Sequence, residues 1–204
     1  MKTKKITAVL MAAAMAVSMA ATTAMSASAE ELDTPVQEEI IEAASEVSST
    51  GKAISWGSRN TNDNYAMTET LYKLDMSGTS MADGAISSAT IKYDGTNYII
   101  TLNTKPITKK YLGINFTADI RTITAHTYSP SGTINAVQSA TDSSVYTITI
   151  PATAQLHYPS GAASTGYTYG IKLQFTTSLE DNWVFSQIPA MSSPSAFMLF
   201  NIAS

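Results

Sequence analysis

The chain of 204 residues contains no cysteine and only two histidines, His126 and His157. Without thiols it can form no disulfide, offer no thiolate to a metal and carry no lipid-modified cysteine, so the core or a ligand must stabilise the fold. The two histidines are not spaced as a His-x-x-x-His pair. A zinc centre is therefore disfavoured by the sequence.

Recognisable catalytic motifs are also missing. No serine lies in a Gly-x-Ser-x-Gly turn, and the one Ser-x-x-Lys, Ser49 to Lys52, lacks the Lys-Thr-Gly strand that would accompany it in a penicillin-binding enzyme. Glu180 and Asp181 are adjacent carboxylates, which we interpret as a polar loop tip rather than an acid/base pair. We predict that the protein is not an enzyme.

The N-terminus has the pattern of a secretory signal peptide over residues 1–29. Lysines at positions 2, 4 and 5 precede the uncharged, apolar or small run 6–24, and Ala27-Ser28-Ala29 offers small residues for cleavage before Glu30. A membrane anchor is the alternative, which the Ala, Ser and Thr content of the run disfavours. We expect a secreted, extracellular protein that is released or loosely held at the cell wall, with no membrane insertion after cleavage.

Removal of residues 1–29 takes three of the twelve lysines and arginines and none of the sixteen acids, so the net charge changes from −4 to −7. An acidic protein of this kind is a poor partner for nucleic acid, whose binding depends on lysine and arginine. An exported protein without cysteine is typical of a Gram-positive-type bacterium.

Residues 30–51 are predicted to form an N-terminal helix and a linker. Thr34 is a plausible N-cap before Pro35, apolar residues recur at helical spacing from Val36 to Val47, and Ser48 to Gly51 ends the pattern.

From residue 52 to 204 the apolar pattern has the period of a β-strand. The clearest hairpin has Asp94-Gly95 at its turn, and the run 197–202 is apolar on both faces, as in a buried strand. The sequence predicts an all-β domain, an immunoglobulin-like antiparallel β-sandwich of about eight strands. The expected strands are 52–56, 65–74, 89–93, 98–102, 114–118, 120–128, 146–150, 167–175 and 197–202.

The segment 77–86 (SGTSMADGAI) separates two of these strands. One interpretation is a short capped turn, because serine and threonine can bond to nearby backbone groups. The other is the lip of a pocket, with Ser80 for a polar group of a ligand, and Met81 and Ile86 for its apolar part.

Residues 65–74, 79–86 (TSMADGAI) and 89–102 (A-x-I-x-YDG-x-x-Y-x-I-x-L) together resemble the front half of a near-iron transporter (NEAT) domain. The resemblance covers roughly 60–203 and weakens after 102. It implies an immunoglobulin-like fold, a secreted or surface location and haem capture between the lip and the last hairpin. Ser80 would face a haem propionate and Met81 the porphyrin, and other surface haem-transfer proteins would be partners.

The chain departs from that family at the iron ligand. The family uses the first tyrosine of a Tyr-x-x-x-Tyr on the final hairpin, a spacing absent here. If Tyr169 matches the second tyrosine, the ligand position is Thr165; if the strand 195–202 matches, the ligand position is near Ala190 or Met191. Met81 and Met191 are candidate haem-iron ligands, since a thioether can bind haem iron, although methionine in such folds is more often core.

Tyr167 and Tyr169 are two residues apart, so they are expected on one face of a strand, as a packing pair or as ligands.

Two functions follow from the sequence. The first is a secreted haem- or porphyrin-binding protein for iron acquisition. The alternative is a secreted immunoglobulin-like binding module for a protein, glycan or cell-wall ligand that does not use haem.

Overall fold

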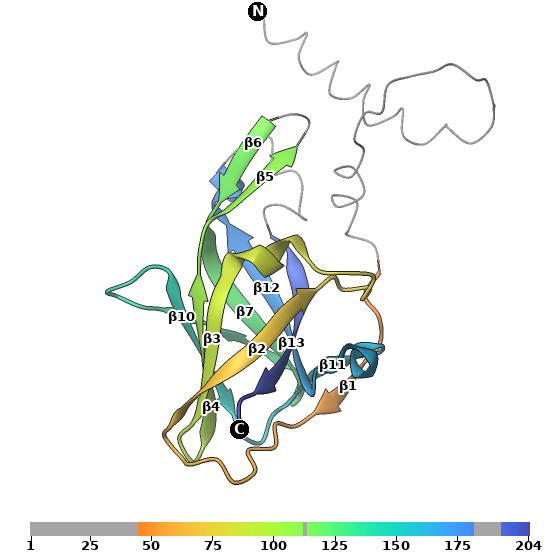
Figure 1. Cartoon of the computed structure of the whole chain (residues 1–204), viewed down its shortest axis with the longest axis vertical. Helices are drawn as coiled ribbons and strands as arrows, with labels where there is room; N and C mark the ends of the chain where they lie inside the picture. Colours follow the sequence, from red (N-terminus) through yellow and green to blue (C-terminus); the bar gives the residue numbers. More distant parts are fainter. Residues whose placement is uncertain (1–44, 112–113, 182–192) are drawn as a thin grey trace, which may run out of the picture. The chain divides into compact units, whose positions relative to one another are not determined.

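The computed structural model describes residues 45–111, 114–181 and 193–204, all within one compact unit (Figure 1). These residues form antiparallel strands joined by turns and short 3₁₀ helices, so the prediction of an all-β domain is confirmed. The immunoglobulin-like arrangement of about eight strands stays a prediction.

Thirteen strands and three 3₁₀ helices are seen in the described residues. They are β1 (Ser49–Lys52), β2 (Asn64–Tyr72), η3 (Met81–Ala85), β3 (Ile86–Tyr93), β4 (Asn97–Thr104), β5 (Ile107–Tyr111), β6 (Ile114–Ala118), β7 (Ile120–Ser129), β8 (Gly132–Asn135), β9 (Val137–Gln138), β10 (Val145–Pro151), β11 (Gln155–Pro159), η4 (Ala162–Thr165), β12 (Tyr169–Thr177), η5 (Ser178–Asp181) and β13 (Ser195–Ile202).

Eleven of these strands form one sheet, in the order β1-β11-β7-β12-β13-β2-β3-β4-β10-β9, with β8 also paired to β7. The sheet curls because the segment 132–138 pairs with β7 through β8 and with β10 through β9. The hydroxyl of Tyr146 in β10 also donates to the carbonyl of Ile120 in β7, at 2.8 Å. Among the described strands, β5 and β6 pair with each other alone, and this hairpin projects from one end of the curled sheet (Figure 1).

The β3–β4 hairpin confirms the turn predicted at Asp94-Gly95. Gly95 has φ of +96°, which an L-residue rarely adopts. The carboxylate of Asp94 accepts the backbone N–H groups of Thr96 and Asn97, at 2.8 and 2.7 Å. These two bonds lower the pKa of Asp94, with that of Asn97 the larger cause. Tyr93 and Tyr98 then pair across the strands, which fixes the register.

The last strand, β13, lies between β12 and β2 and is buried on both faces, as its sequence predicted. Its residues 196, 198, 200 and 202 face the main core inside the curled sheet. Phe197 and Leu199 face outward into a second cluster. That cluster also contains Ala162 and is covered by Val47, Tyr72, Leu74, Met76, Tyr158 and Tyr167.

The N-terminal part of the domain differs from the prediction. The helix expected from residue 30 lies mostly outside the described residues; residues 45–48 have no regular structure, and Ser49–Lys52 is a strand paired with β11. The strand predicted over 52–56 is wrong beyond Lys52. Ile54 and Trp56 instead lie in a loop whose buried side chains join the main core.

This loop closes one end of the curled sheet. The indole of Trp56 packs against the rings of Tyr65, Tyr93 and Tyr98, at centroid distances of 5.4, 5.7 and 5.8 Å. Arg59 ties the loop to the end of β13, donating to the carbonyls of Ile202 and Ala203.

Substitutions of Trp56 test how this loop closes the end of the sheet. Its indole N–H is buried and meets no acceptor in the described part of the chain, so Trp56→Phe removes no hydrogen bond and should cost less than about 1.5 kcal/mol of unfolding free energy. Trp56→Ala leaves a cavity among the tyrosines and should cost about 3–5 kcal/mol. Urea unfolding followed by circular dichroism measures both. Equal losses for the two variants would contradict the assignment of Trp56 to packing alone.

Candidate functional site

The segment singled out in the sequence forms η3 and is held by its own polar groups. Ser80 is the N-cap, and its hydroxyl accepts the N–H of Ala82 at 3.3 Å. The Ser80 N–H donates to the Leu71 carbonyl, and the Leu71 N–H donates to the Asp83 carboxylate, each at 2.8 Å. This segment is therefore the capped turn of the first interpretation, fixed to the end of β2.

The same helix forms one wall of a cleft, as the second interpretation expected. Met81, Ala82 and Ala85 lie on this wall. The other lining residues come from the β5–β6 hairpin, β7, β12, η5 and the segment before β13. They are Ile107, Phe116, Ala118, Asp119, Ile120, Phe175, Thr177, Leu179 and Pro194.

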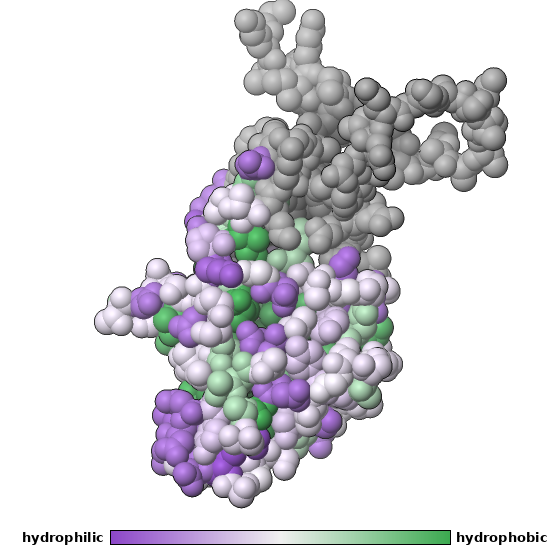
Figure 2. Space-filling view, in the orientation of Figure 1, coloured by the Kyte–Doolittle hydropathy of each residue, from purple (hydrophilic) through white to green (hydrophobic). Residues whose placement is uncertain are grey.

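The cleft is apolar and narrow. Its cavity volume is about 40 Å³. Apolar surface is visible in Figure 2 where the projecting hairpin joins the main sheet. A cleft of this kind binds apolar groups by removing their surface from water.

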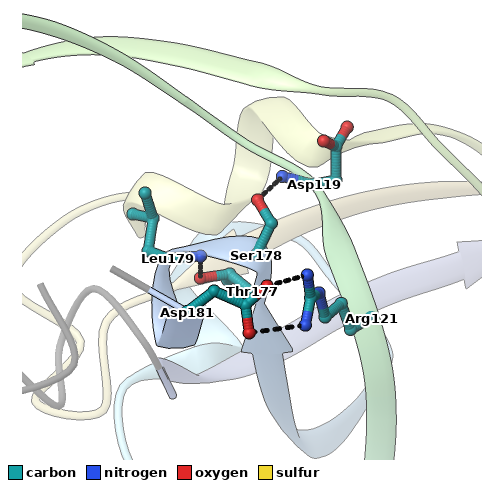
Figure 3. Close-up of polar contacts among 6 residues, drawn as sticks. All are labelled: Asp119, Arg121, Thr177, Ser178, Leu179 and Asp181. Atoms are coloured by element: carbon teal, nitrogen blue, oxygen red, sulfur yellow. Dashed lines mark hydrogen bonds and ion pairs between the residues drawn. The ribbon is translucent and has the colours of Figure 1, made fainter. Parts of the chain in front are cut away.

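One side of the cleft is closed by η5, which follows β12. Ser178 is fixed to Asp119 by two bonds, since its N–H donates to the Asp119 carbonyl at 2.8 Å and its hydroxyl accepts the Asp119 N–H at 3.0 Å. Leu179, whose N–H donates to the Thr177 hydroxyl, is buried and lines the cleft. Figure 3 shows these contacts beside the ion pair of Arg121 and Asp181.

That ion pair is exposed at the end of η5. The guanidinium of Arg121 meets both carboxylate oxygens of Asp181, with Nη1 at 3.0 Å from Oδ1. The hydrogen bond to Asp181 is the largest of the causes that raise the pKa of Arg121. The polar loop tip predicted at Glu180 and Asp181 is thus the outer end of a short helix.

The structure separates the candidate residues named from the sequence. Met81 lines the cleft, whereas Ile86 begins β3 and is buried in the main core. Ser80 is 9% exposed, and its hydroxyl caps η3. Met191 lies outside the described residues.

The two tyrosines do not share a face, so that prediction is wrong. Tyr167 precedes β12 and packs in the outer cluster, with its hydroxyl 2.7 Å from that of Thr70. Tyr169 packs against the main core and donates to the carbonyl of Ser55 at 3.0 Å. Tyr169 is six residues from Phe175 of the cleft, or about 20 Å along β12.

Sequence reasoning missed most of the cleft. No sequence motif marks Ile107, Phe116 or Leu179. A weak signal is the mostly polar segment 178–181, which lies shortly after the predicted strand 167–175.

No three histidine, aspartate or glutamate side chains come together as a metal site in the described residues. Within the same residues, no helix is long and apolar enough to cross a membrane. Comparisons of the chain with family models, curated proteins and solved structures found no match. The resemblance to NEAT domains therefore rests on the sequence motifs alone.

The two histidines lie on neighbouring strands, away from the cleft lining. His157 in β11 bonds to the Ser49 hydroxyl at 2.8 Å, and His126 lies opposite Lys172. Burial is the largest of the causes that lower the pKa of both histidines below the ordinary value of 6.5. The positive charge of Lys172 lowers both pKa values further, whereas the negative charge of Glu46 raises them.

We expect stability to fall as the pH drops below about 6.5, because the unfolded chain binds protons at these histidines before the folded protein does. The loss continues until the lower folded pKa values are reached. Urea unfolding between pH 5.5 and 7.5 measures this loss of stability. Most carboxylates titrate below this pH window. The double variant His126→Gln/His157→Gln should have a flatter profile. An unchanged slope in that variant would assign the pH dependence to other groups.

Proposed function

We propose that the chain is an exported protein that binds haem or a related porphyrin in the cleft beside η3. The observation that supports this most directly is the position of Met81, a thioether on the wall of an apolar cleft. The proposal includes an immunoglobulin-like, NEAT-like fold, a secreted location in a Gram-positive-type bacterium and other surface haem-transfer proteins as partners.

The lining has the apolar chemistry of a porphyrin site, although the observed space is smaller than a porphyrin ring. Phe116 and Ile107 from the hairpin and Phe175 from β12 offer aromatic and aliphatic surface, and thioethers pack well against such rings. A thioether is also a known axial ligand of haem iron, so Met81 would be one candidate ligand. The phenols of Tyr167 and Tyr169 are bonded elsewhere, to Thr70 and to Ser55.

A ligand without iron is the second candidate. It is favoured by the small volume of the cleft, about 40 Å³, and by the lack of any histidine or tyrosine among its described lining residues. In this case the protein would be a secreted binding module whose cleft takes a smaller apolar group of a protein, glycan or cell-wall ligand.

Titration of the protein from residue 30 onward with hemin and with iron-free protoporphyrin tests the proposal. We expect saturation at one equivalent and a shifted Soret band for hemin. Met81→Ala should weaken hemin binding by about tenfold, equivalent to 1.4 kcal/mol, and should change the Soret band. Tyr169→Phe is the matched control and should leave both unchanged.

The outcomes separate the candidates. A featureless hemin titration with no porphyrin binding would reject the haem proposal and leave the iron-free ligand. A spectrum that Met81→Ala does not change, but Tyr169→Phe does, would assign the iron to the tyrosine instead.

A further inference from the structure

We infer that the loop around Arg59 forms a second binding site, which takes a small sugar that carries a carboxylate. The site is a depression lined by Gly57, Ser58, Arg59, Asn60, Tyr65 and Ser204. Figure 1 shows this loop, in orange, at the end of the curled sheet opposite the β5–β6 hairpin. The site is therefore separate from the cleft beside η3, and its test does not depend on the haem proposal.

The depression has room for a small molecule without movement of any element. Its cavity volume is about 320 Å³, compared with about 40 Å³ for the cleft beside η3. Pockets that hold small molecules in proteins usually measure about 300–1,000 Å³. The depression is therefore suited to a ligand at the small end of that range.

The guanidinium of Arg59 is fixed in place by three backbone carbonyls. Nε donates to Ala203 at 2.7 Å and Nη2 to Ile202 at 2.9 Å, while Nη1 donates to Trp56 at 2.9 Å. The same group lies 6.0 Å from the ring centroid of Trp56 and 5.9 Å from that of Tyr65. A positive group held in this way loses little conformational entropy when it binds a ligand.

Arg59 keeps hydrogen-bonding capacity after these contacts are made. A guanidinium has five N–H groups, so Nη1 and Nη2 each keep one beyond the carbonyl bonds. The described residues show no ion pair of Arg59 with a carboxylate. A Cβ atom on Gly57 would lie 3.8 Å from Nη1, so glycine leaves this side of the guanidinium uncovered. A ligand carboxylate is the group that such an arginine binds best.

The rest of the lining favours a sugar as the body of the ligand. Ser58 offers a hydroxyl and Asn60 an amide, and both can hydrogen-bond to the hydroxyls of a sugar. Asn60 is held in place, since its N–H donates to the Tyr65 hydroxyl at 2.9 Å and its Nδ2 to Asp63 at 3.0 Å. Tyr65 adds an aromatic ring to the same wall. These groups suit a ligand in which hydroxyls surround one carboxylate.

D-glucuronate, D-glucose and acetate test the inference, because the last two carry the hydroxyls alone and the carboxylate alone. Nuclear magnetic resonance of the ¹⁵N-labelled protein from residue 30 onward, with any tag at its N-terminal end, locates the binding. We expect saturable shifts of the backbone amides of Gly57, Ser58 and Asn60 with glucuronate. Its affinity should exceed those of glucose and acetate by about tenfold or more.

Three variants assign the affinity to the loop. Arg59→Lys keeps the charge but loses the planar pair of nitrogens, and should weaken glucuronate binding by about fivefold or more. Arg59→Gln should remove the preference for glucuronate over glucose. Ser58→Ala leaves the three carbonyl bonds of Arg59 in place and should weaken glucuronate binding by about threefold. It keeps the test decisive if the loop does not fold without arginine, which circular dichroism would reveal.

Arg121→Gln is the matched control, because it removes the same charge from an arginine that does not line the depression. It should leave the affinity for glucuronate unchanged. Absence of shifts at Gly57, Ser58 and Asn60 with glucuronate would overturn the inference. Acetate binding as tight as that of glucuronate would reduce the site to one for simple anions and overturn the sugar assignment. An equal loss of affinity in Arg121→Gln would overturn the role of Arg59.

Discussion

The fold depends on the burial of β13 on both faces. This strand joins β12 to β2, and side chains from its two faces supply the main core and the outer cluster. Without disulfides, no covalent cross-link joins the main core to the outer cluster. The packing of Phe197 and Leu199 outward and of Met198 and Phe200 inward must therefore hold them together. The pairing of β13 with β2 is also distant in sequence, which makes this step of folding slow.

The curled sheet encloses the main core and leaves an opening at each of its two ends. At one end, Trp56 and its tyrosine neighbours fill the opening, and Arg59 fixes the loop that carries them. At the other end, short elements cover the opening: η3, the β5–β6 hairpin and η5. Short elements bury little surface and open at lower cost than strands of a sheet, so the second end is the physically favourable place for a ligand.

Local features of this fold could be predicted from the sequence, and non-local ones could not. The Asp94-Gly95 turn and the Ser80 cap depend on residues within three positions of each other, so their chemistry is visible in the sequence. The cleft combines side chains from six parts of the chain, which no short motif specifies. The error at Tyr167 has a local cause: Gly166 has φ of +82°, and the N–H of Thr168 bonds to Asn201 outside the strand ladder. The alternating pattern of the sequence therefore begins two residues before β12, which starts at Tyr169.

The charge around the cleft bears on what it can bind. The chain has a net charge of −4, and Asp119, Glu180 and Asp181 all lie near the guanidinium of Arg121, each of them raising its pKa. In the observed arrangement such a rim disfavours an anionic ligand, since the guanidinium is already paired.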